Sequence, residues 1–164
     1  MIGELIMNKF MKVATELSEE NLKTKVGGPF GACVVKNGKI IGKGSNHVLK
    51  NNDPTAHAEI MAIRNACKTL KSYDLSDCIL YTSCYPCPMC LSATIWANIK
   101  TLYYVNTKED ASDIGFRDEH IYEFIDKLED NKVDNSVLKL KSIDREKTIK
   151  AFDEFKENEN SAIY

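Results

Sequence analysis

Hydrophobic positions along the chain change their period several times, and each change marks a predicted element. A first amphipathic helix is predicted over residues 3–25, directly before Gly27-Gly28-Pro29. Its apolar positions recur at helical spacing: Ile6, Phe10, Val13 and Leu17. The following run, ACVVKNGKIIGKG, places two β-rich segments around Asn37-Gly38, which is a strong signal for a hairpin.

Helices and strands then alternate. A second helix is predicted after Asp53-Pro54, a candidate N-cap and first-turn proline, with an apolar stripe made of Ile60, Ile63, Cys67 and Leu70. The remaining predicted elements are strands at 78–83, 101–105 and 136–143, and helices from Pro88 through Trp96, over 109–130 and over 145–157. This order favours an α/β fold, a three-layer α/β/α sandwich around a mixed five-stranded sheet, formed as one domain by residues 1–164.

The composition suits a globular domain in a reducing compartment. The chain has 164 residues, of which 43% are hydrophobic, enough to bury a core. Glu4 and Lys9 interrupt the apolar opening, so we expect neither a signal peptide nor a membrane span, and a cytoplasmic location. Six cysteines in a reducing compartment do not indicate a disulfide framework, so the clustered ones point to metal.

Charge is unevenly distributed along the chain. Residues 1–106 carry 12 Lys/Arg and 8 Asp/Glu, whereas residues 107–164 carry 10 and 16. Phosphate contacts supply much of the affinity of nucleic-acid-binding proteins. The acidic second part therefore argues against a nucleic acid partner.

Two short motifs carry the candidate chemistry. SCYPCPMC at 83–90 and DPTAHAEI at 53–60 each open a predicted helix, and the two helix N-termini are expected to converge. His57, Cys87 and Cys90 would then supply three ligands to one zinc ion per chain and leave a fourth position for water. Glu59 would carry protons as the general acid/base. In the alternative interpretation, Cys84 closes a structural site with these ligands.

These residues resemble a known superfamily. His57-Ala58-Glu59 with Pro86-Cys87-Pro88-Met89-Cys90 matches the signature of the zinc-dependent cytidine deaminases, which implies the cytidine deaminase-like fold and hydrolytic removal of an amino group. Within it, the chain most closely resembles the bacterial guanine deaminases, which convert guanine to xanthine and ammonia. The matching stretches outside the motifs include GGPFGA at 27–32, SNH at 45–47 and DIGFRD at 113–118.

The resemblance also implies roles for further residues. The positions that match substrate-binding residues are Phe30, Asn46, Ala58, Trp96, Asp118 and Tyr164. Phe30 would stack on the purine, Asn46 and Asp118 would recognise its polar edge, and Tyr164 would close over it. The resemblance further implies a homodimer with exchanged C-terminal segments, residues 145–164. One departure is Tyr85, which stands where these enzymes usually have glutamate.

Three classes of function follow from this reading. The first is a deaminase of guanine or of another amino-substituted heterocycle or nucleoside. The second is a tRNA adenosine deaminase, which the central motifs match equally well but the acidic second part disfavours. The third is a non-catalytic zinc-binding module, which would have little use for Glu59.

Overall fold

A computed structural model describes residues 7–130, 134–158 and 162–163. The chain divides into two compact units, Met1–Glu119 and His120–Tyr164. None of the helices in the described ranges combines the length and apolarity needed to cross a bilayer.

The first unit is built on a mixed sheet of four strands in the order β2-β1-β3-β4. Its strands are β1 (Gly31–Lys36), β2 (Lys39–Ser45), β3 (Cys78–Cys84) and β4 (Thr101–Asn106). β1 is antiparallel to β2 and β3, and β3 is parallel to β4. The predicted hairpin is confirmed, because Asn37 and Gly38 both have positive φ and join β1 to β2 in a two-residue turn.

The prediction of a fifth strand at 136–143 is wrong. These residues form a turn followed by irregular chain, and β4 stays an edge strand of the sheet in the described part of the protein. The apolar side chains that suggested a strand are exposed: Val137, Leu138, Leu140 and Ile143. An apolar pattern alone does not make a strand, because the backbone groups also need a neighbouring strand to pair with.

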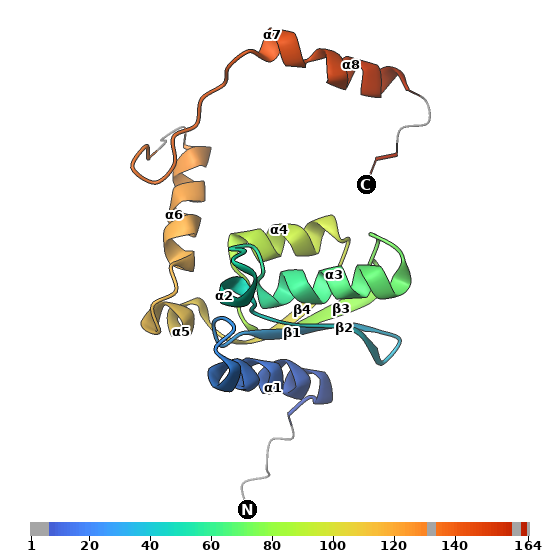
Figure 1. Cartoon of the computed structure of the whole chain (residues 1–164), viewed down its shortest axis with the longest axis vertical. Coiled ribbons are helices and arrows are strands. Elements are labelled where there is room, and N and C mark those ends of the chain that lie inside the picture. Colours follow the sequence, from blue (N-terminus) through green and yellow to red (C-terminus); the bar gives the residue numbers. More distant parts are fainter. Residues whose placement is uncertain (1–6, 131–133, 159–161, 164) are drawn as a thin grey trace, which may run out of the picture. The chain divides into compact units, whose positions relative to one another are not determined.

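Helices cover both faces of this sheet, so the three-layer α/β/α arrangement is confirmed (Figure 1). α1 (Lys9–Thr24) packs on one face through Met11 and Ala14, against Cys33, Val35 and Tyr81. α3 (Ala58–Leu70) and α4 (Pro88–Trp96) lie on the other face.

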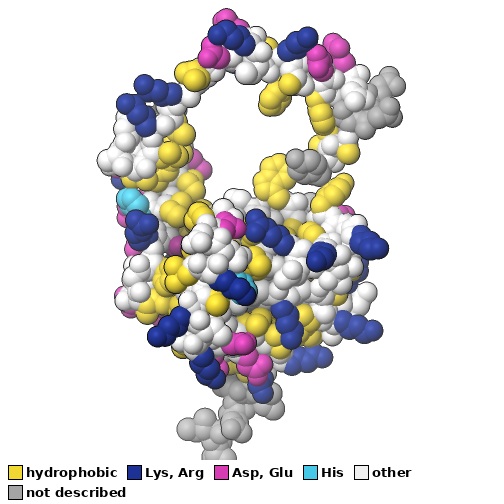
Figure 2. All heavy atoms as spheres, viewed as in Figure 1, with side chains coloured by type: hydrophobic (Ala, Val, Ile, Leu, Met, Phe, Trp, Pro, Cys, Tyr) yellow, Lys and Arg dark blue, Asp and Glu magenta, His cyan; other side chains and the backbone are white. Residues whose placement is uncertain are grey.

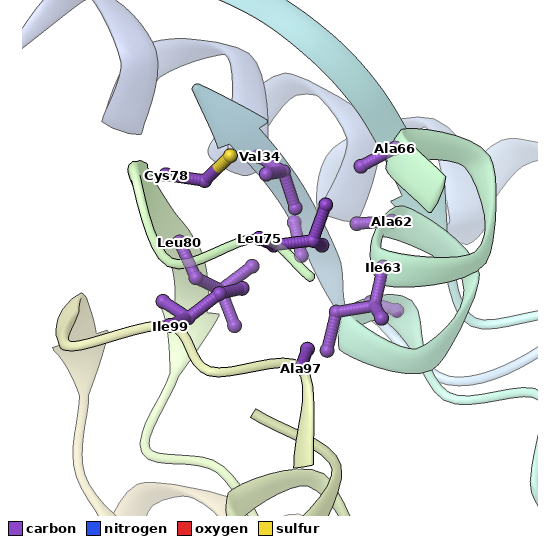
Figure 3. Close-up of a cluster of buried hydrophobic side chains, with 11 residues drawn as sticks. Val34, Ala62, Ile63, Ala66, Leu75, Cys78, Leu80, Ala97 and Ile99 are labelled. Atoms are coloured by element: carbon purple, nitrogen blue, oxygen red, sulfur yellow. The ribbon is translucent and has the colours of Figure 1, made fainter. Parts of the chain in front are cut away.

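The second face holds the larger core. Figure 3 shows side chains of β1, β3 and α3 converging there with residues of the connecting loops. The labelled residues are Val34, Ala62, Ile63, Ala66, Leu75, Cys78, Leu80, Ala97 and Ile99. Complete burial of Leu75 and Leu80, each worth about 1.5–3 kcal/mol, makes this cluster a main source of the unit's stability.

Small residues bring α3 unusually close to β2. A side chain at Gly44 would collide with the backbone of Ala58 and Ala62, and one at Gly42 would collide with Ala62 and Ala66. The three alanines lie four residues apart on one face of the helix and are fully buried. This close approach holds the N-terminus of α3 firmly against the sheet.

The other helices differ in detail from the prediction. The predicted helix at 109–130 is two helices, α5 (Lys108–Asp113) and α6 (Asp118–Glu129), separated by a turn at Gly115, whose φ of 95° favours glycine. The predicted helix at 145–157 divides into α7 (Arg145–Thr148) and α8 (Lys150–Glu157). A short α2 (Val48–Asn51) precedes α3.

Asp53 does not cap α3. Its carboxylate accepts from the backbone N–H of Thr55 at 2.8 Å and forms a local turn, and α3 begins only at Ala58 with His57 as N-cap. The turn at Asp53 delays the helix by one turn, and this displacement decides which residues stand at the helix N-terminus.

Candidate active site

A pocket lies at the end of the sheet where β1 begins and β2 and β3 end. Strand pairing places Gly31 beside Ser45, and Ala32 beside Thr82, so the residues next to these pairs meet at one edge. The backbone N–H of Asn46 donates to the carbonyl of Phe30 at 3.0 Å. The residues that line the pocket are Phe30, Asn46, His57, Glu59, Cys84, Tyr85, Cys87, Phe116 and Asp118.

His57 and Cys87 occupy equivalent positions at the starts of two helices. His57 is the N-cap of α3 and Cys87 is the N-cap of α4, where Pro88 occupies the first helical turn. Neither side chain makes a capping hydrogen bond to its own helix. Both side chains are therefore available for a shared ligand.

These two residues converge with Cys90, which lies in the first turn of α4. The Nδ1 atom of His57 is 3.6 Å from the Cys87 Sγ and 3.7 Å from the Cys90 Sγ. Zinc–sulfur and zinc–nitrogen bonds of about 2.3 and 2.0–2.1 Å at a tetrahedral angle place the two ligand atoms about 3.6 Å apart. The spacing and the soft donor set of these three residues therefore fit zinc.

The helix N-termini also favour negative charge on the sulfurs. Hydrogen bonding from Cys90 and then from His57 lowers the pKa of the Cys87 thiol, while the same bond to Cys87 raises the pKa of Cys90. Backbone N–H groups at the start of a helix stabilise a thiolate. These surroundings favour a thiolate at Cys87, the form of cysteine that binds zinc.

Glu59 lies beside the ligand cluster and is 4% exposed. Its Oε2 is 3.4 Å from the Cys90 Sγ, and its Oε1 accepts a hydrogen bond from the Thr82 hydroxyl at 2.7 Å. Burial raises the pKa of the Glu59 carboxyl. A carboxyl group with a raised pKa beside a candidate metal site is suited to take up and release protons.

Aromatic rings form another wall of the pocket. The rings of Phe30 and Phe116 meet edge to face, with centroids 4.7 Å apart. Tyr85 also lines the pocket, and its ring contacts Tyr104 with a centroid distance of 5.0 Å and lies under the Lys108 ammonium at 4.8 Å. Such rings provide flat apolar surfaces suited to a planar heterocycle.

Two polar side chains complete the pocket. Asn46 is buried, and its Oδ1 accepts from the backbone N–H of Val48 at 3.2 Å, which leaves its NH₂ group for other partners. Asp118 is partly buried, and burial together with the negative charge of Cys87 raises the pKa of its carboxyl. The pocket therefore presents both a donor and an acceptor to a polar ring edge.

The structure places most, but not all, of the predicted site residues in this pocket. The structure brings together His57, Cys87, Cys90, Glu59, Phe30, Asn46 and Asp118. Ala58 is fully buried against Gly44, and Trp96 at the end of α4 is 65% exposed, so neither lines this pocket. Tyr164 lies outside the described residues.

Cys84 does not join the metal ligands in the described part of the chain. It lies at the end of β3, is buried, and donates through its Sγ to the carbonyl of Thr107 at 3.4 Å. Burial raises the pKa of this thiol to about 11, so it stays protonated. The structure therefore favours an open three-residue site over the closed structural one.

Sequence reasoning missed two residues that shape the pocket. Phe116 reaches it because the turn at Gly115 redirects the chain between α5 and α6. Asn21 supports it from α1, where its Nδ2 donates to the carbonyls of Gly28 at 2.9 Å and Asn46 at 2.8 Å. An asparagine within a helix is a weak signal for such a role, because this residue disfavours helix interiors.

Comparisons with known proteins agree with this geometry. The family model for the cytidine and deoxycytidylate deaminase zinc-binding region matches residues 6–106. This segment contains His57, Cys87 and Cys90, the three residues of the candidate zinc site.

Individual relatives extend the similarity. The chain is 55% identical over 118 residues to a guanine deaminase of Bacillus subtilis, covering 72% of this chain and 76% of that protein. A crystal structure of guanine deaminase from Bacillus subtilis superposes with a TM-score of 0.84 at 44% identity, covering 96% of this chain and 99% of that one. A tRNA-specific adenosine deaminase of Buchnera aphidicola is 46% identical over 96 residues, which cover 58% of each chain.

Proposed function

The chain belongs to the zinc-binding family of cytidine and deoxycytidylate deaminases, and from this premise we propose that it hydrolyses guanine to xanthine and ammonia. The observation that carries the proposal is the composition of one pocket. Phe30, Asn46 and Asp118, which are far apart in sequence, line the same pocket as Glu59 and the zinc ligands. A stacking ring, an amide and a carboxylate are the groups that a flat purine with a polar edge requires.

The proposed reaction adds water to guanine and expels its 2-amino group. The water oxygen bonds to C2, the bond between C2 and the amino nitrogen breaks, and ammonia leaves. A zinc ion held by His57, Cys87 and Cys90 would supply a Lewis acid that lowers the pKa of the attacking water. Glu59 takes one proton from the water and delivers it to ring N3, then transfers the second to the departing amino group. Its position beside the Cys90 sulfur supports this role.

Asp118 and Asn46 orient the base in this proposal. A carboxylate accepts from the ring N–H groups of guanine, and the NH₂ group of Asn46 donates to its carbonyl oxygen. The edge-to-face pair of Phe30 and Phe116 supports one face of the ring. Tyr164 would cover the ring after it binds, as the resemblance to guanine deaminases implies.

A homodimer with exchanged C-terminal segments, residues 145–164, is part of the proposal. Apolar side chains are exposed in both units (Figure 2), which supports an extensive partner contact. The exposed large side chains of α4 and β4 are Ile95, Trp96, Tyr103, Tyr104 and Val105, and those of α8 are Phe152 and Phe155. Sedimentation of the chain with and without residues 145–164 tests this part, because a monomer in both cases would contradict it.

A cytoplasmic location and a single domain over residues 1–164 stay predictions.

Ammonia release from a panel of substrates tests the proposed activity. The panel comprises guanine, guanosine, adenine, cytosine, triazine amines and an adenosine-containing tRNA stem-loop, each compared with the Glu59→Gln variant. Guanine should be turned over fastest, with xanthine as the product. Faster turnover of the stem-loop than of guanine would overturn the proposal in favour of a tRNA deaminase.

A further inference from the structure

A buried hydroxyl on the sheet is bonded to the carboxylate of Glu59. Thr82 on β3 is fully buried, and its Oγ1 donates to Glu59 Oε1 at 2.7 Å. The bond joins the central sheet to the first turn of α3. Its length and burial make it a strong charge-assisted hydrogen bond when the carboxylate is ionised.

The two oxygens of Glu59 consequently have different surroundings. Oε1 is held by Thr82, whereas Oε2 lies 3.4 Å from the Cys90 Sγ, on the side of the metal ligands. Thr82 itself has little freedom, because β3 pairs it with Ala32 on one side and with Tyr104 on the other. The hydroxyl therefore attaches one oxygen to an internal strand that is paired on both sides.

We propose that Thr82 is a positioning residue for the deamination, which restrains the Glu59 carboxylate so that Oε2 faces the reacting atoms. The inference rests on the proposed deaminase activity. A carboxylate free to rotate about its terminal torsion would spend part of its time with neither oxygen placed for proton transfer. A misplacement of about 1 Å can lower a rate about 100-fold, so a single hydrogen bond at this place has a large effect on turnover.

Thr82→Val tests the inference, because valine has nearly the shape of threonine but no hydroxyl. We expect kcat for guanine to fall about 10- to 100-fold while KM changes less than about twofold. Zinc content should stay at one ion per chain. Thr82→Ser restores the hydroxyl and should recover kcat to within about threefold of the original protein.

Thr94→Val is the matched control. Thr94 is also buried and its Oγ1 also makes a 2.7 Å hydrogen bond, but the acceptor is the carbonyl of Cys90 within α4. This variant should lose stability comparable to that of Thr82→Val without the selective loss of kcat. An equal loss of kcat in both valine variants would overturn the inference, since the effect would then be one of general packing.

A readout independent of activity comes from crystal structures of the Thr82 variants. The Glu59 carboxylate should be displaced or divided between conformers in Thr82→Val and single in Thr82→Ser. If Thr82→Val does not fold, Thr82→Ala supplies the same test with a smaller side chain. An undisplaced Glu59, an unchanged kcat or a loss of zinc in the hydroxyl-free variant would each refute the positioning role. If the unaltered protein does not turn over guanine, the proposed function is refuted instead. The position of the Glu59 carboxylate in the variants would then still test whether Thr82 restrains it.

Discussion

Asn21 offers a sharp test of how the pocket is supported. It lies on α1, far from the metal motifs, and is 3% exposed. Its NH₂ group donates to the carbonyl of Gly28 at 2.9 Å and to that of Asn46 at 2.8 Å. These carbonyls belong to the two loops that carry Phe30 and Asn46. Removal of this side chain should therefore loosen the substrate side of the pocket and leave the zinc side intact.

The cost of Asn21→Ala can be worked from these contacts. Each hydrogen bond contributes about 0.5–1.5 kcal/mol net, so the loss of both destabilises the fold by about 1–3 kcal/mol. The Gly28 carbonyl keeps its bond from the Phe30 N–H at 2.8 Å, so it does not become an unsatisfied buried acceptor. For a chain of this size the change lowers Tm by roughly 2–12 °C.

Asn21→Asp separates hydrogen bonding from packing. Aspartate has the shape of asparagine, but its ionised carboxylate would face two carbonyl oxygens with no proton to donate. We expect a larger destabilisation than in Asn21→Ala at pH 7. The folded state would favour the protonated carboxyl and raise its pKa above the unfolded value of about 3.9, so the deficit should shrink as pH falls toward that value.

Urea denaturation of the zinc-loaded variants measures the change in stability. Steady-state kinetics with guanine as substrate measures the change in KM. KM should rise several-fold in both variants, with zinc content unchanged. Asn65→Ala is the control, since the Asn65 side chain makes one exposed hydrogen bond to the Lys43 carbonyl at 2.8 Å. Its free energy of unfolding should change by no more than about 0.5 kcal/mol. The reasoning would be refuted if Asn21→Ala kept the stability and the KM of the unaltered protein. It would also be refuted if Asn21→Asp were more stable than Asn21→Ala at pH 7.

The remaining predictions concern the catalytic side and the chain end. Cys87→Ala should lose zinc and Cys84→Ala should keep it, as measured by metal analysis; equal loss would indicate a closed structural site. Glu59→Gln should keep zinc and fold but lose about 10²–10⁴ in kcat, and an active variant would contradict the mechanism. Asp118→Ala should raise KM for guanine because a charge-assisted contact is lost, and zinc content should stay unchanged; steady-state kinetics and metal analysis measure the two. Deletion of residues 160–164 should lower guanine turnover by roughly tenfold with stability unchanged, as expected for loss of a cover; full turnover would contradict that role.

Local patterns predicted the elements whose signals are complete within a few residues. The hairpin at Asn37-Gly38 and helix α4 from Pro88 to Trp96 agree with the prediction, because turn residues and a first-turn proline act through their own backbone. The delayed start of α3 was missed, since the turn at Asp53 competes with capping and only the folded chain decides between them.

The sequence by itself determined which residues are candidate zinc ligands, and it predicted Glu59 as the proton carrier. Two ligands and the proton carrier stand at helix starts that short motifs define, and the chemistry of thiolate, imidazole and carboxylate restricts what they do together.

Only the tertiary structure decided the contacts of Asn21, Thr82 and Phe116, and the absence of a fifth strand in the described residues. Each contact joins elements distant along the chain, such as the bond from Thr82 to Glu59. For that bond, the register of β3 and the close approach of α3 to Gly42 and Gly44 set the positions of the two side chains. Periodicity within one segment records which face is buried but not which side chain of another segment it meets.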